Sequence, residues 1–138
     1  MKNKFFNVAK AVSKTSDYPR IKIGCCIVKK NKILSVGANL LKSHPTQKSF
    51  NKYRDIDTDK MHNNIHAEFD AILKVANKNN LNGADIYLYR ENYNGELRMC
   101  RPCKACMMML KVYSIKNIYY TTADGYCKEE VIKWKRQE

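Results

Sequence analysis

This sequence lacks long hydrophobic runs: no stretch approaches the roughly 20 consecutive apolar residues that cross a bilayer. Its basic start, Met1 to Phe6, precedes neither a long apolar segment nor a small-residue cleavage site. Glycine and proline are scarce, at 5 and 3 residues, and form no linker, and we find no internal repeat or low-complexity segment. These absences argue against a membrane protein and predict an intracellular, cytoplasmic one.

Acidic residues are also few, with 13 Asp and Glu against 26 Lys and Arg and a formal net charge of +13. The basic residues spread from Lys2 to Arg136 rather than forming a tail or a stripe. We interpret them as a generally solvated basic surface, with attraction of phosphate groups as a secondary effect. A hydrophobic content of 44% over 138 residues predicts a globular chain, with residues 1–138 forming a single domain.

Hydrophobic periodicity and turn residues predict the order of the elements. We expect helices over 3–16, 64–79 and 102–113, and strands over 21–28, 33–37, 85–89 and 115–121. Residues 39–64 are predicted to form one long loop of the kind that tends to be functional. Residues 126–136 could form a terminal helix or a strand, and we favour the helix. This order predicts an α/β fold, a three-layer α-β-α sandwich with a mixed four- or five-stranded sheet.

Two short motifs carry side chains suited to metal chemistry: H-A-E at residues 66–68 and P-C-K-A-C at residues 102–106, each at a predicted helix start. A structural zinc site is usually closed by four protein ligands, whereas a catalytic site keeps one position for water. The motifs supply three ligands, and Glu68 remains beside the open position. Alone, the C-x-x-C pair would also suit a zinc ribbon or a redox pair. Together the motifs predict a catalytic site with one Zn²⁺ per chain, held by His66, Cys103 and Cys106.

The placement of these residues fits hydrolytic chemistry. Zinc lowers the pKa of bound water from about 15.7 towards about 7, which makes hydroxide available near neutral pH. Cys103 and Cys106 are three residues apart, and a helix start both favours thiolates and tolerates Pro102. We assign Glu68 the role of catalytic proton shuttle, although an offset of about 200° from His66 on a regular helix requires an irregular first turn.

With H-x-E followed by P-C-x-x-C, the chain resembles the cytidine and deoxycytidylate deaminase superfamily over about residues 18–122. Beyond the zinc motif, four segments carry the resemblance: two strands, the helix of the histidine ligand, and the strand after the cysteine helix. They are residues 22–28, 33–39, 66–72 and 115–120.

The resemblance implies a cytidine deaminase-like fold, a five-stranded mixed sheet between helices. It also implies that Asn39 contacts the sugar of the substrate, although a strand-ending turn residue would look the same. We assign Ala67 and Pro102, which adjoin the metal ligands, to the substrate site as well. Many relatives complete their sites from neighbouring subunits, so a homo-oligomer is expected.

The function that follows is hydrolytic deamination of a cytosine nucleotide, with deoxycytidylate or a close relative as substrate. Residues 40–45 depart from the segment usual in deoxycytidylate deaminases, and the zinc motif does not name the base. One alternative is a deaminase acting on cytosine or adenine in single-stranded DNA or RNA, and a second is a non-catalytic zinc module that binds nucleic acid.

Several other residues lie near the motifs. His44 and His62 are in the predicted long loop and are interpreted as solvent-exposed. Cys100 precedes Cys103 by three residues, but His66 already supplies the third ligand, so we leave Cys100 out of the metal site. Three basic residues flank the cysteine helix and could receive a phosphate: Arg98, Arg101 and Lys104.

Overall fold

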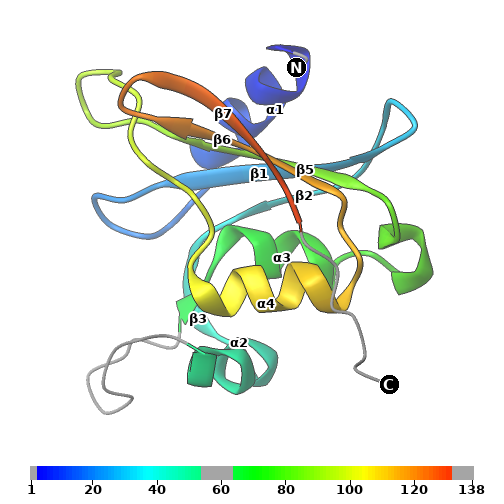
Figure 1. Cartoon of the computed structure of the whole chain (residues 1–138). Coiled ribbons are helices and arrows are strands. Elements are labelled where there is room, and N and C mark those ends of the chain that lie inside the picture. The colour runs from blue at the N-terminus through cyan, green and yellow to red at the C-terminus, as the bar shows by residue number, and fades with distance from the viewer. Residues whose placement is uncertain (1–2, 54–63, 132–138) are drawn as a thin grey trace.

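The structure is a computed structural model that describes residues 3–53 and 64–131 (Figure 1). Its central sheet has five strands in the order β2-β1-β5-β6-β7, and β5 and β6 are its parallel pair. The strands are β1 (Ile23–Lys29), β2 (Lys32–Ala38), β5 (Asp85–Arg90), β6 (Asn117–Thr122) and β7 (Gly125–Glu130). The α-helices are α1 (Asn3–Ser13), α2 (Pro45–Phe50), α3 (Ala67–Leu73) and α4 (Lys104–Val112).

Helices cover both faces of this sheet. Helix α1 lies on one face, and α3 and α4 lie on the opposite face, with α2 beyond α4 (Figure 1). Members of the three-layer α-β-α class have this arrangement, so the predicted sandwich with a mixed sheet is confirmed, with five strands.

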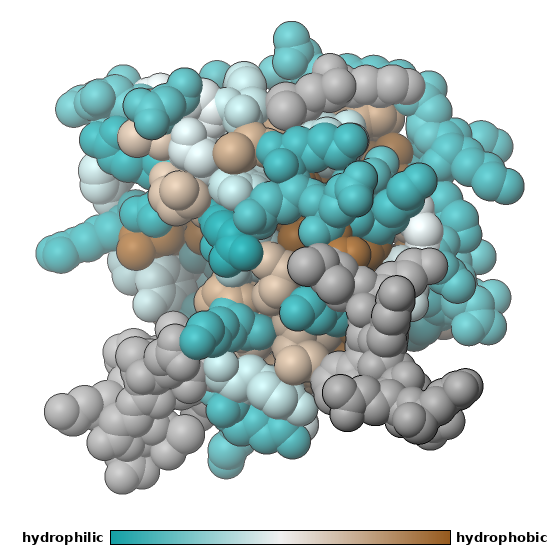
Figure 2. Space-filling model, viewed as in Figure 1, coloured by the Kyte–Doolittle hydropathy of each residue, from teal (hydrophilic) through white to brown (hydrophobic). Residues whose placement is uncertain are grey.

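The middle residues of β1 and β5 are apolar or aromatic, as expected of strands that are buried on both faces. Cys25 and Ile27 of β1 pack in the core on the side of α3 and α4, whereas Cys26 and Val28 pack against α1. The same alternation holds in β5, where Ile86 and Leu88 face the first core and Tyr87 and Tyr89 the second. Hydrophilic residues cover most of the face shown in Figure 2.

Two glycines let helices approach the sheet closely. A Cβ at Gly24 would lie 2.1 Å from the Ala9 carbonyl oxygen of α1, and a Cβ at Gly37 would lie 2.4 Å from the Ala71 nitrogen of α3. Both glycines therefore fix the height of a helix above the sheet, and Gly37 fixes that of the helix that follows His66.

The segment predicted as one long loop contains regular structure in its described part. Strand β3 (Leu40–Ser43) pairs with β4 (Asn64–Ile65), and α2 is followed by a 3-10 turn over Asn51–Tyr53. The loop prediction is wrong there because Pro45 at the start of α2 and the buried Gln47 give this short helix a tertiary anchor that polar composition conceals.

Two predicted helices differ from the structure. The helix predicted over 64–79 is shorter: α3 spans Ala67–Leu73, and Asn77 then caps a separate 3-10 turn over Lys78–Leu81. The helix favoured from residue 126 is wrong, because Gly125–Glu130 pairs with β6 as strand β7 after a two-residue turn at Ala123-Asp124. Asp124-Gly125 is a turn signal in the sequence, and Gly125, the first residue of β7, adopts φ 133°. Among the helices in the described residues, none has the length and apolar character of a membrane span.

Candidate metal centre and active site

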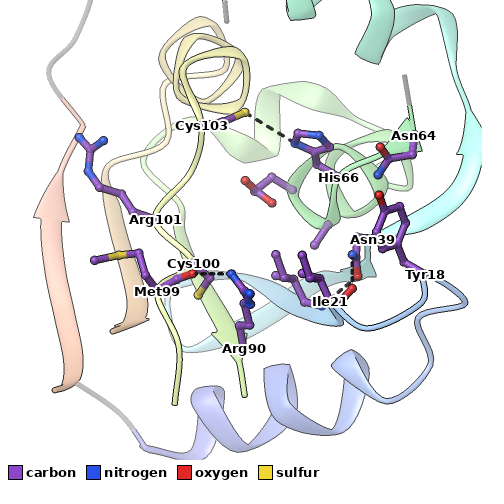
Figure 3. A pocket seen from close by; sticks show the side chains of 13 residues that line it. Tyr18, Ile21, Asn39, Asn64, His66, Arg90, Met99, Cys100, Arg101 and Cys103 are labelled. Carbon is purple, nitrogen blue, oxygen red and sulfur yellow. Dashed lines mark hydrogen bonds between the residues drawn. The ribbon is translucent and has the colours of Figure 1, made fainter. Parts of the chain in front are cut away.

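The candidate site lies where two helices begin. His66 is the N-cap of α3 and Cys103 is the N-cap of α4, both with extended backbone, and neither side chain caps its own helix. Ser, Thr, Asp or Asn at such positions usually stabilises a helix by about 0.5–2 kcal/mol. Here the two side chains point toward each other instead (Figure 3). Their residue types therefore serve the contact between the helices rather than the helix ends.

The possible ligand atoms are close enough to share one ion. His66 Nδ1 lies 3.3 Å from Cys106 Sγ and 3.6 Å from Cys103 Sγ, and the three atoms all lie within 4.8 Å of one another. Tetrahedral zinc, with bonds of about 2.05 Å to nitrogen and 2.3 Å to sulfur, requires nitrogen–sulfur separations of about 3.6 Å. The donor set fits zinc in both chemistry and spacing.

Glu68 adjoins this group as the second residue of α3. Because His66 lies before the helix with extended backbone, the difficulty of a 200° offset between the two side chains disappears. The Glu68 side chain is buried, and burial raises the pKa of its carboxyl group while the nearby His66 opposes that shift. The neighbouring Cys106 thiol also counters the rise in the pKa of this carboxyl group.

The two thiols of the C-x-x-C pair share a proton unequally. A hydrogen bond from Cys106, together with His66, holds the pKa of the Cys103 thiol far below its usual range, against the effect of burial. Burial raises the pKa of the Cys106 thiol. Without a metal, the proton of the pair therefore stays on Cys106 at neutral pH.

A cavity of about 350 Å³ opens beside these groups (Figure 3). His66, Glu68 and Cys103 lie on its lining, together with the apolar or aromatic side chains of Tyr18, Ile21 and Met99. Its volume is at the lower end of the range of about 300–1,000 Å³ for small-molecule sites. The cavity thus joins the candidate metal ligands and a buried carboxyl group to a space for a ligand.

Two arginines also line the cavity, and they differ in their partners. Arg101 pairs with Glu129, with 2.8 Å between Nε and the carboxylate oxygen. Arg90 donates from a guanidinium nitrogen to the Met99 carbonyl at 3.2 Å, and no carboxylate within the described residues forms an ion pair with it. Arg90 therefore keeps positive charge available to an anionic ligand.

Asn39 lines the cavity, as a substrate contact would, but its side chain also holds the chain together. Its Oδ1 accepts hydrogen bonds from the Ser16 hydroxyl at 2.7 Å and from the Ile23 N–H at 2.9 Å. Its Nδ2 donates to the Ile21 carbonyl at 2.8 Å. Asn39 thereby positions the segment that carries Tyr18 and Ile21, and its contact with a sugar stays a prediction.

The other predicted residues are distributed as follows. Ala67 lines the cavity, whereas Pro102 is buried between two lining residues and is not one of them. Cys100 lines the cavity, but its sulfur lies 3.1 Å from the Thr121 hydroxyl and is not part of the group of three. His44 caps α2 through Nδ1, and His62 lies outside the described residues. Neither Arg98 nor Lys104 lines the cavity.

Sequence reasoning missed Tyr18 and Arg90. Tyr18 lies between the helix predicted over 3–16 and the strand predicted over 21–28, where no motif marks it as functional. Arg90 ends β5, which runs parallel to β6, and ligands often bind at the carboxyl ends of parallel strands. This position at the carboxyl end of a predicted strand is the feature of the sequence that could have indicated a binding role for Arg90.

Comparison with known proteins identifies the class. The chain belongs to the cytidine and deoxycytidylate deaminase family, because the model of that family's zinc-binding region matches residues 1–122. No curated protein matches the sequence significantly.

Solved structures share the fold at low sequence identity. The dCMP deaminase of cyanophage S-TIM5 in apo form is 22% identical, with a TM-score of 0.58 over 87% of this chain and 84% of that one. The same enzyme in complex with dCMP and dUMP is 20% identical, with a TM-score of 0.59 over 87% and 82%. The cytidine deaminase of Burkholderia pseudomallei is 17% identical, with a TM-score of 0.61 over 95% and 93%.

Proposed function

We propose that this protein hydrolyses the exocyclic amino group of a cytosine nucleotide and releases ammonia, with deoxycytidylate as the favoured substrate. The observation that carries the proposal is the group His66, Cys103 and Cys106, whose ligand atoms lie within 4.8 Å of one another beside the buried carboxyl group of Glu68. Family membership supports deamination, and the nucleotides bound by the S-TIM5 enzyme support the choice of substrate.

The three side chains would hold one zinc ion, which supplies water ionised near neutral pH when bound. Glu68 would accept a proton from the attacking water and deliver it to the ring nitrogen of the base. It would then assist proton transfer to the amino group, which leaves as ammonia while the new oxygen stays on the ring. Burial of the carboxyl group keeps bulk water from competing for that proton.

Arg90 would bind the phosphate of the substrate. It lines the cavity and has no carboxylate partner in the described part of the chain, whereas Arg101 is already paired with Glu129. A phosphate accepts charge-assisted hydrogen bonds from a guanidinium group, each contributing about 1.5–3 kcal/mol. This interaction favours a nucleotide over a nucleoside.

The experiment measures ammonia release from cytidine, deoxycytidine, their monophosphates and adenosine nucleotides by the zinc-loaded protein. We expect turnover of a cytosine nucleotide and a loss of about 10²–10⁴-fold in Glu68→Gln, which keeps the size of the side chain and the three ligands. Unchanged turnover in Glu68→Gln, or no turnover of any substrate by the wild type, contradicts the proposal. The latter result with zinc still bound indicates a non-catalytic zinc module.

A matched pair of variants tests the phosphate contact. Arg90→Gln and Arg98→Gln remove the same charge, but only Arg90 lines the cavity. We expect Arg90→Gln to lower kcat/KM for the monophosphate by about 10–100-fold and to leave deoxycytidine turnover unchanged. Equal effects of the two variants would show that only the overall charge matters.

A further inference from the structure

The Gln47 side chain is fully buried, although α2 also contains exposed residues before and after it in sequence, Pro45 and Lys48. Its Oε1 accepts a hydrogen bond from the backbone N–H of His66 at 3.1 Å. Its Nε2 donates to Asn51 Oδ1 at 2.8 Å. Because the N–H of His66 can only face an oxygen, these two bonds also fix which way the amide is oriented.

The backbone of His66 depends on this contact. As the N-cap of α3, His66 has extended backbone and its side chain makes no capping bond. Its carbonyl accepts the Asp70 N–H at 3.0 Å, so the helix holds His66 from one side. The bond from His66 to Gln47 holds it from the other side, where β4 is a strand of only two residues.

The imidazole makes this backbone position matter for the metal. The ring nitrogen nearest both thiols is Nδ1, which is bonded to the ring carbon next to Cβ. The possible ligand atom is therefore close to the main chain, and a shift of the His66 backbone moves this atom by nearly the same distance. Metal–ligand distances tolerate deviations of only about 0.2 Å.

We infer that Gln47 is a positioning residue for the zinc site: through the backbone of His66 it holds the imidazole at the distance that the metal requires. The inference rests on the proposed function, because it assumes that His66 binds zinc. Groups outside the ligand shell that orient a ligand commonly change metal affinity by about 10–100-fold when they are replaced.

The test compares Gln47→Met with Ser35→Ala. Methionine is similar in length to glutamine but cannot accept the His66 hydrogen bond. Ser35 donates to the Ala71 carbonyl at 2.7 Å, so the control also removes one hydrogen bond to the backbone of α3, but five residues beyond His66. For each variant, zinc affinity is measured by competition with a chromophoric chelator, and stability by urea unfolding of the metal-free protein.

We expect both variants to lose stability, whereas only Gln47→Met lowers zinc affinity, by about 10–100-fold. Gln47→Glu retains an acceptor for the His66 N–H and should recover most of the affinity. If Gln47→Met does not fold without metal, Asn51→Ala removes the acceptor of the Gln47 Nε2 hydrogen bond, leaves Gln47 itself in place and should weaken zinc binding by a smaller factor.

Equal zinc affinity in Gln47→Met and the wild type, or equal losses in Gln47→Met and Ser35→Ala, would overturn the inference. For Asn51→Ala, unchanged affinity would do the same. A wild-type protein that binds no zinc would instead refute the proposed function, so the two failures are distinguishable.

Discussion

Because Gly37 lies against α3, we expect one methyl group added at this position to lower both the stability of the fold and the affinity for zinc. In Gly37→Ala the new Cβ would lie 2.4 Å from the Ala71 nitrogen and 2.5 Å from the Ala67 carbonyl oxygen. Ordinary van der Waals contact begins at 3.4 Å, so α3 must move away from β2 by about 1 Å.

That movement exceeds what a metal site tolerates. Ala67 directly follows His66, and Glu68 is in the same turn of α3. A shift of about 1 Å is several times the tolerance of about 0.2 Å for metal–ligand distances. We expect overpacking to destabilise the metal-free protein by about 1–3 kcal/mol. Zinc affinity should fall at least about tenfold, as it does when the support of a ligand is lost.

Gly24→Ala is the matched control. Its Cβ would lie 2.1 Å from the Ala9 carbonyl oxygen and 2.3 Å from the Ser13 nitrogen, both in α1, which supplies none of the three candidate ligands. We expect a comparable loss of stability in urea unfolding with nearly unchanged zinc affinity in chelator competition. The reasoning is refuted if Gly37→Ala is destabilised to the same degree as Gly24→Ala and still binds zinc like the wild type.

Three further predictions concern protons, a buried carboxylate and salt. Because burial raises the pKa of Cys106, the pair of thiols holds one proton at neutral pH, and zinc must displace it. Zinc affinity measured between pH 6 and 8 should therefore rise about tenfold per pH unit, and a pH-independent affinity would contradict this. The Asp70 carboxylate accepts the Ala38 N–H at 3.0 Å and pairs with the exposed Lys74. Urea unfolding should show a loss of about 1.5–3 kcal/mol for Asp70→Ala and less than about 1 kcal/mol for Lys74→Ala, and the reverse order would count against the assignment. Raising salt from about 50 to 200 mM should slow turnover of a free nucleotide by about fourfold at most, whereas a loss of about 10³–10⁵ in affinity would indicate a polynucleotide bound through many phosphates.

The arrangement of the site could be predicted to the extent that local spacing determines it. Residues 66–68 and 102–106 each lie at a helix start, and the sandwich brings those two starts together. The strands were predictable because β1 and β5 are apolar on both faces. The sequence does not contain the reason that His66 lies outside its helix, since that depends on contacts made after folding.

Other parts could not be predicted because they depend on distant contacts. Gln47 is typical of an exposed loop by composition, and its burial depends on a hydrogen bond to His66, 19 residues further along the chain. Arg90 is one basic residue among many until the cavity places it. The hairpin of β6 and β7 is different: Asp124-Gly125 is a turn signal that can be read in the sequence, and the preference for a helix there overlooked it.

X-ray absorption at the zinc edge of the zinc-loaded protein tests the central claim most directly, because it reports which atoms surround the ion. The account predicts two sulfur neighbours at about 2.3 Å and two nitrogen or oxygen neighbours at about 2.0–2.1 Å, from Cys103, Cys106, His66 and one water molecule. The same spectrum of Cys103→Ser should lose one sulfur neighbour. A shell of four sulfurs, or one with no sulfur, would contradict the account.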